Sequence, residues 1–202
     1  MILKMKIDLN SISEYIGYNA YVTLSMFFIS LFVLILNYIT NGKLNKYFFS
    51  VARDSWLKPR TYIRLFTHIL GHSDWNHFYN NYLTILLLGP LIEEKYGSIN
   101  VIIMILVTAF ITGLIVHIKG NVRVQGASSI VFMFIVLSAF VNVIDNKIPL
   151  TFILIILFYV VNEIIDLGKD DNIAHYGHIT GAICGAIFGF ICVNQNLSDF
   201  FI

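Results

Sequence analysis

Apolar runs of about twenty residues recur along almost the whole of this 202-residue chain. A helix of that length matches the hydrocarbon core of a bilayer. Backbone N–H and C=O groups cannot stay unpaired in lipid, so each run is expected to be helical. Only 12% of the residues are charged, against about a quarter in soluble domains. The sequence therefore predicts an all-α, polytopic integral membrane protein.

Six apolar segments are predicted to be transmembrane helices. They cover about residues 18–39, 77–92, 100–118, 126–143, 148–165 and 176–193. The second segment is short for a full crossing, and the first is too long for the core of a cleaved signal peptide. Residues 41–76 form the one stretch long enough for a structured loop, so residues 1–202 are predicted to be a single domain.

The basic residues are unevenly distributed between the two sides of this predicted bundle. The side of the N-terminus holds four of them, and the other side holds nine: Lys43, Lys46, Arg53, Lys58, Arg60, Arg64, Lys119, Arg123 and Lys169. The tendency of basic residues to stay cytoplasmic would place the N-terminus outside. Without the six residues of the first loop the count is four against three, so charge determines the orientation only weakly. A net charge of +1 gives no sign of a nucleic-acid partner.

The sequence Gly126-Ala127-Ser128-Ser129 begins the fourth predicted helix and offers a candidate nucleophile in Ser128. Glycine at position 126 tolerates unusual backbone angles and lets another segment come close, as a nucleophile requires. The alternative is that these small residues form a helix-packing patch, which is common in membranes.

His178, near the start of the sixth predicted helix, is a candidate general base. Gly181, Gly185 and Gly189 follow it at a spacing of four and share one helical face. Such a stripe lets two helices approach closely, and with the fourth helix as partner it would bring the imidazole within about 3 Å of Ser128. His175 is a competing base. The alternative is an interfacial histidine without a catalytic role.

His77 and Asn81 are four residues apart and therefore neighbours on one face of the second helix. Both side chains can donate hydrogen bonds to a developing oxyanion. The alternative is a capping histidine and an asparagine bonded to another helix. Asn80 points about 100° away from Asn81.

His68, His72 and His77 could instead form a metal site, because imidazole is a common zinc ligand. No carboxylate or thiol lies at ligand spacing beside them, so a metal-binding or transporting protein is the weaker hypothesis. We expect neither a metal nor an organic cofactor.

Taken in order, these motifs resemble the rhomboid family of intramembrane serine proteases. The run from Arg64 through His68, His72 and His77 to Asn81 is similar to the family's pattern between the first loop and the second helix. Gly89, Glu93 and Gly97 match its G-x-x-x-E-x-x-x-G turn. Gly126-Ala127-Ser128 matches the start of G-x-S-G, and Gly177-His178-Ile179-Thr180-Gly181 resembles A-H-x-x-G. The resemblance covers about residues 64–189.

The resemblance implies a six-transmembrane-helix rhomboid-like bundle with a Ser–His dyad. Ser128 would be the nucleophile, His178 the base, and His77, Asn81 and the Ser128 N–H the oxyanion hole. Phe132 would pack on the base. The supporting residues would be Phe132, Gly126, Gly181, Glu93 and Arg64.

An enzyme of this kind is a serine endopeptidase that cleaves transmembrane segments of membrane proteins in the bilayer. The resemblance implies a cell-membrane location, a cytoplasmic N-terminus and a first loop embedded on the opposite side. The alternative is a non-catalytic rhomboid-like protein that binds membrane clients.

The chain departs from the family pattern at three positions. Ser129 replaces the second glycine of G-x-S-G and offers a rival hydroxyl. Gly177 replaces the usual alanine, and Pro90 stands where glycine is frequent. None of the three changes removes a proposed catalytic group.

Overall fold

The computed structural model describes residues 17–119, 123–141, 143, 147–161 and 172–194. In this part of the chain the regular structure is helical, apart from one antiparallel bridge between Val51 and Val124. The helices are α2 (Tyr21–Ile39), α3 (Lys43–Tyr47), α4 (Pro59–Thr67), η1 (His68–Leu70), α5 (Trp75–Tyr96), α6 (Ser98–Lys119), α7 (Ser128–Ser138), α8 (Leu150–Ile155), η2 (Ile156–Val160) and α10 (Asn172–Asn194).

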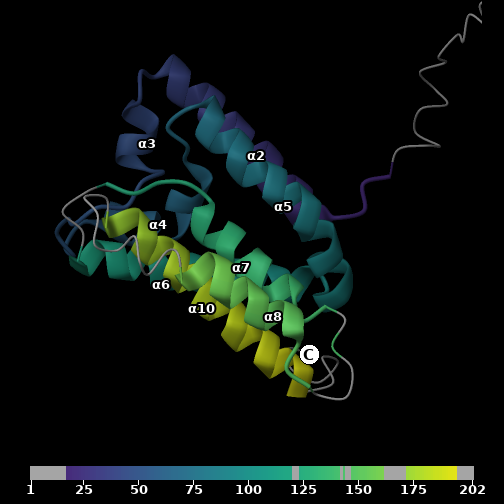
Figure 1. Ribbon diagram of the computed structural model, residues 1–202. Coiled ribbons are helices and arrows are strands. Elements are labelled where there is room, and N and C mark those ends of the chain that lie inside the picture. Colours follow the sequence, from purple (N-terminus) through teal and green to yellow (C-terminus); the bar gives the residue numbers. More distant parts are fainter. Residues whose placement is uncertain (1–16, 120–122, 142, 144–146, 162–171, 195–202) are drawn as a thin grey trace, which may run out of the picture.

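The helices form two groups joined through α7 (Figure 1). In one group α2 and α5 lie side by side, and in the other α6 and α10 lie next to α7. α7 also packs against α5, so the short helix is surrounded by longer ones. The short helices α3 and α4 lie together at one end of the molecule.

Within the described residues, three helical segments are long and apolar enough to cross a membrane: Tyr21–Ile39, Ser98–Lys119 and His175–Val193. Two shorter apolar helices cover Ser128–Ser138 and Leu150–Tyr159. The count of six spans therefore stays a prediction. Part of the fifth predicted span, residues 162–165, lies outside the described residues.

The second predicted helix is longer than the sequence suggested. It runs for 22 residues from Trp75 to Tyr96, which corresponds to a length of about 33 Å. Hydropathy alone ended the helix before Glu93 and Glu94, because charged side chains are costly in a membrane. Helix α5 continues past Glu93 because that carboxylate is buried among hydrogen-bond donors.

The fourth and sixth predicted helices also differ in length from the structure. α7 covers only Ser128–Ser138, and a tight turn follows it. α10 begins at Asn172, so His178 lies inside the helix rather than in its first turn. Both differences arise because an apolar run marks hydrophobic surroundings and not the ends of a helix.

Glu93 joins the C-terminal part of α5 to the N-terminus of α2. Its carboxylate accepts hydrogen bonds from Val22 N (2.9 Å), Thr23 N (3.1 Å), Thr23 Oγ1 (3.0 Å) and Ser98 Oγ (2.7 Å). The first N–H groups of a helix lack intrahelical partners, and a negative charge there is favourable. Gly89, one turn before Glu93, lets Thr23 approach, since a Cβ on Gly89 would lie 2.5 Å from the Thr23 side chain.

Aromatic side chains fill the rest of the interface between α2 and α5. Phe27 of α2 contacts Phe78 and Tyr82 of α5, with ring centroids 5.5 Å and 5.4 Å apart. The buried Tyr82 hydroxyl donates to the carbonyl oxygen of Met26 at 3.0 Å. This interface fixes α5, which carries His77 and Asn81, in position relative to α2.

We predict that Glu93→Gln lowers the stability of the protein by about 1–3 kcal/mol, because it weakens charge-assisted hydrogen bonds to α2. Glu94→Gln is the matched control, since Glu94 is the adjacent carboxylate and is exposed. Thermal unfolding of both variants in detergent measures the effect. Equal midpoints for the two variants would contradict this role of Glu93.

Candidate active site

The segment that leads into α7 is held in place by two histidines of the first loop. Gly126 has φ +119°, a conformation that L side chains rarely adopt. Its N–H donates to the carbonyl oxygen of His68 at 2.9 Å, and the Ala127 N–H donates to Nε2 of His72 at 3.4 Å. Hydrogen bonds from the N–H groups of Gly126 and Ala127 therefore fix the backbone just before Ser128.

Ser128 and Ser129 have different surroundings although they are adjacent. Ser128 is the first residue of α7 and is partly exposed. Ser129 is only 2% exposed, and its Oγ has no hydrogen-bond partner among the described residues. Of the two adjacent serines, Ser128 is therefore the more exposed.

The glycine stripe of α10 packs against α7. A Cβ on Gly181 would lie 2.1 Å from the carbonyl oxygen of Ser129, and a Cβ on Gly185 would lie 2.5 Å from that of Met133. A Cβ on Gly189 would meet the ring of Phe140 at 2.3 Å. The fourth predicted helix is thus the partner of the stripe, and only glycines permit this approach.

This approach brings His178 onto the face of α7 that carries Ser128. The His178 ring stacks on Phe132, with centroids 4.4 Å apart and an angle of 9° between the planes. Phe132 lies four residues after Ser128, hence one turn further along the same face. His175 lies next to His178, with ring centroids 6.1 Å apart.

His77 and Asn81 face the same segment from α5. A Cβ on Gly126 would lie 2.5 Å from Nε2 of His77 and 3.4 Å from Nδ2 of Asn81. Asn81 is buried, whereas His77 is only half-buried. The imidazoles of His77 and His178 are close enough to interact electrostatically. Asn80 is exposed, and the helix turns it about 100° away from Asn81.

The turn before α5 orients His77. Asp74 is the N-cap of α5 and accepts a hydrogen bond from the His77 N–H at 2.9 Å. Ser73 Oγ donates to Asp74 Oδ2 at 2.6 Å and lies 3.1 Å from Nδ1 of His77. With Nδ1 occupied in this way, Nε2 is the ring nitrogen that faces Gly126.

His72 holds both the Asn81 amide and the Ala127 backbone. Burial lowers the pKa of His72 to about 3, so its imidazole is neutral near pH 7. Nδ1 lies 3.3 Å from the carbonyl oxygen of Leu70, and Nε2 lies 3.1 Å from Nδ2 of Asn81. Nδ1 therefore carries the proton and donates, and Nε2 accepts. One N–H of the Asn81 amide remains for another acceptor.

From the sequence, His72 was assigned a possible role as a metal ligand and a place in the family pattern, but no structural role, and Ser73 and Asp74 were not singled out. A polar pair just before a helix is a signature of an N-terminus, so Asp74 could have been recognised as a cap. The role of His72 depends on contacts with residues 81 and 127, which no local pattern reveals.

The three histidines that were considered as metal ligands make hydrogen bonds within the protein instead. His68 is fully buried, with Nδ1 3.1 Å from the carbonyl oxygen of Arg64. Across the described ranges, no group of three or more His, Cys, Asp or Glu side chains is arranged to hold a metal ion.

Glu93 and Arg64, which were predicted as supporting residues, act away from Ser128. Glu93 caps α2 as described above. Arg64 is buried, and its Nε donates to the carbonyl oxygen of Tyr47 at 2.9 Å. Arg64 thereby fixes the fold of the first loop.

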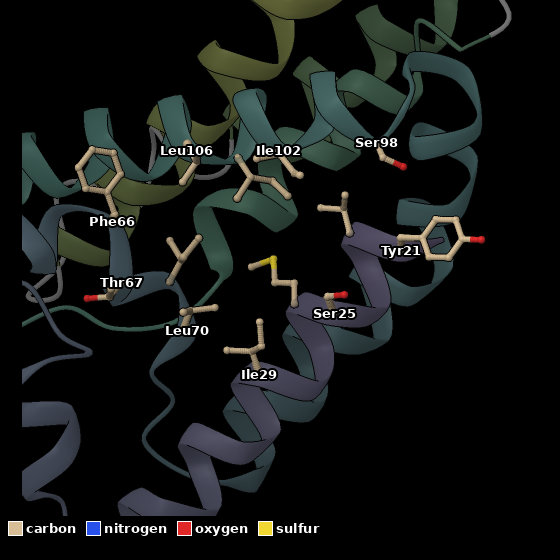
Figure 2. A pocket seen from close by; sticks show the side chains of 13 residues that line it. Tyr21, Ser25, Ile29, Phe66, Thr67, Leu70, Ser98, Ile102 and Leu106 are labelled. Carbon is tan, nitrogen blue, oxygen red and sulfur yellow. The ribbon is translucent and has the colours of Figure 1, made fainter. Parts of the chain in front are cut away.

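A separate cavity of about 500 Å³ lies between α2, the α4–η1 segment and α6 (Figure 2). Its walls are almost wholly apolar, with Met26, Ile29, Leu70, Ile102 and Leu106 among them. None of the predicted catalytic or oxyanion-hole residues lines it.

Comparison with known proteins gives the family of the chain. The model of the Rhomboid domain matches residues 59–195, which is more than half of the chain. The chain belongs to the rhomboid family. The match includes every motif from Arg64 to Gly189, and together with the apolar helices it makes the chain an integral membrane protein. A search of curated protein sequences found no match.

We predict that Gly181→Ala destabilises this rhomboid protein by about 1–3 kcal/mol, because the methyl group would force α10 away from the Ser129 carbonyl. Gly177→Ala is the matched control on the same helix. Its Cβ would lie 3.7 Å from Thr112, which is ordinary contact. Thermal unfolding compares the two variants, and a Gly181→Ala protein as stable as Gly177→Ala would contradict the close packing.

Proposed function

We propose that this chain is an intramembrane serine endopeptidase that cleaves transmembrane segments of other membrane proteins. Ser128 is the nucleophile and His178 the general base of a Ser–His dyad. The observation that carries the proposal is the seating of α10 on α7, which stacks His178 on Phe132 one turn from Ser128. Membership of the rhomboid family supports the reaction class.

In the proposed reaction Ser128 Oγ attacks the carbonyl carbon of the scissile peptide bond while His178 takes the hydroxyl proton. The tetrahedral intermediate collapses, and the leaving amine receives that proton from His178. Water then attacks the acyl-enzyme with the same base and releases the second product. No metal or organic cofactor takes part in these steps.

The negative charge of the intermediate needs donors that are already in position. Nε2 of His77 and the free N–H of Asn81 face the segment before Ser128. For Nε2 of His77 to donate, the neutral ring must carry its proton there. In the proposed reaction the Ser73 hydroxyl therefore turns from Asp74 Oδ2 and donates to His77 Nδ1. The N–H of Ser128 belongs to the first turn of α7, whose N–H groups have no intrahelical partner, and the helix dipole favours an anion there. These three donors are the proposed oxyanion hole.

The substrate must expose a carbonyl that a membrane helix would normally hide in its own hydrogen bonds. We expect cleavage where Gly, Pro or polar residues weaken the substrate helix, and the family resemblance supports a small residue before the cleaved bond. The family resemblance supports a cytoplasmic N-terminus in the cell membrane, with the first loop on the opposite side.

The test is cleavage of a single-span substrate with a Gly-rich segment by protein reconstituted in vesicles. We expect wild type and Ser129→Ala to release a product, and Ser128→Ala and His178→Ala to release none. Gel electrophoresis and mass spectrometry of the product give the rate and the cleaved bond.

The Ser129→Ala variant separates the two adjacent hydroxyls, and thermal unfolding shows whether each inactive variant is folded. Full activity of Ser128→Ala would rule out the dyad. A folded wild type that binds several such substrates and cleaves none would favour the non-catalytic, client-binding alternative.

Loss of one oxyanion-hole donor should reduce the cleavage rate without abolishing it. Asn81→Ala should lower the cleavage rate by about 10²–10³-fold, because it removes one donor and leaves the nucleophile intact. Asn80→Ala is the matched control, since the neighbouring amide is exposed and points away. Steady-state cleavage rates compare the two, and equal rates would remove Asn81 from the mechanism.

A further inference from the structure

The first loop has an excess of positive charge that the proposed protease mechanism does not use. Six basic side chains lie between residues 43 and 64, and Asp54 is the one acidic residue in that interval. Asp54 makes ion pairs with Lys58 at 2.7 Å, Arg60 at 3.1 Å and Arg64 at 3.3 Å. A single carboxylate therefore serves three cations, and most of the positive charge stays uncompensated.

The other three cations of the loop, Lys43, Lys46 and Arg53, have no carboxylate partner among the described residues. The same holds for Arg123, which lies near the loop. All four are exposed. Arg123 comes from the segment before α7, yet its Nη1 donates to the carbonyl oxygen of Lys46 at 3.0 Å and to Ser50 Oγ at 2.9 Å. These contacts bring a cation from a distant part of the sequence onto the loop.

The cations of this region are close enough to repel one another. Burial lowers the pKa of the Arg64 guanidinium, and the charges of Arg123 and Arg60 lower it further. Asp54 opposes the effect only in part. An anion bound from outside would relieve this repulsion.

Apolar and aromatic side chains are exposed among these cations. Leu57 is 92% exposed, and Tyr47, Phe48, Trp56 and Tyr62 are each about half exposed. Trp and Tyr gather at the level of lipid headgroups, and surfaces that mix them with Lys and Arg lie in the bilayer interface. This mixture distinguishes the loop from a purely polar surface suited to an acidic soluble partner.

We propose that Lys43, Lys46, Arg53 and Arg123 form a binding surface for the phosphates of anionic phospholipids in the leaflet that the first loop faces. Trp56 and its aromatic neighbours insert beside the headgroups. Arg and Lys donors match phosphate oxygens, and anionic leaflets attract such basic segments. The inference rests on the membrane location of the chain and not on the proposed protease activity.

Trp56 provides a reporter that does not depend on catalysis. The chain has two tryptophans, so Trp75→Phe leaves Trp56 alone. This protein is reconstituted in phosphatidylcholine vesicles with a minor fraction of phosphatidylglycerol, and bromine is placed on one lipid or the other at equal mole fraction. Brominated phosphatidylglycerol should quench Trp56 more than brominated phosphatidylcholine, and salt should reduce the difference.

Two double variants assign the effect to the loop. Lys46→Gln with Arg53→Gln should reduce the preference for phosphatidylglycerol, by up to about fivefold for each cation removed. Lys95→Gln with Lys147→Gln, which the sequence places on the opposite side, should leave it unchanged. Thermal unfolding checks that both proteins are folded.

Equal quenching of Trp56 by the two brominated lipids would overturn the proposal. A preference that persists in the Lys46→Gln, Arg53→Gln protein would also overturn it, because these cations would not be responsible. Equal quenching by the two lipids, together with binding of an acidic peptide to the loop in lipid-free detergent, would assign the surface to a protein partner instead.

Discussion

The contact between Gly181 of α10 and the Ser129 carbonyl of α7 determines the geometry on which the proposed site depends. A methyl group at position 181 would lie 2.1 Å from that oxygen, so the helices meet at a distance that only glycine permits. The close contact continues at Gly185 and Gly189, which pack against Met133 and Phe140. Between membrane helices such close packing provides the attraction, because lipid removes the hydrophobic driving force.

Polar groups complete the arrangement where backbone atoms would otherwise stay unpaired. Glu93 satisfies the N-terminus of α2, and His68 and His72 bind the two N–H groups that precede Ser128. A buried polar group without a partner is costly in a membrane, so these residues hold α2, α5 and α7 in one relative position. That fixed position places His77 and Asn81 beside Gly126, two residues before Ser128.

Much of this arrangement follows from the sequence because it depends on local spacing. The four-residue repeat of Gly181, Gly185 and Gly189 indicated a close helix contact, and the spacing of His77 and Asn81 put them on one face. Helix ends could not be predicted in the same way. Hydropathy predicts that the helix ends before the charged Glu93. In the structure α5 continues past it, because four donors surround the carboxylate. The roles of His72 and of the buried Ser129 depend on contacts between distant segments, which spacing does not contain.

The most direct measurement of the central claim is to map a covalent adduct on the purified protein. A fluorophosphonate reacts with a serine only where a base activates the hydroxyl, and tandem mass spectrometry identifies the modified residue. The account predicts one adduct, on Ser128, that disappears in the folded His178→Ala variant. An adduct on Ser129, or an adduct on Ser128 that persists without His178, would contradict the proposed dyad.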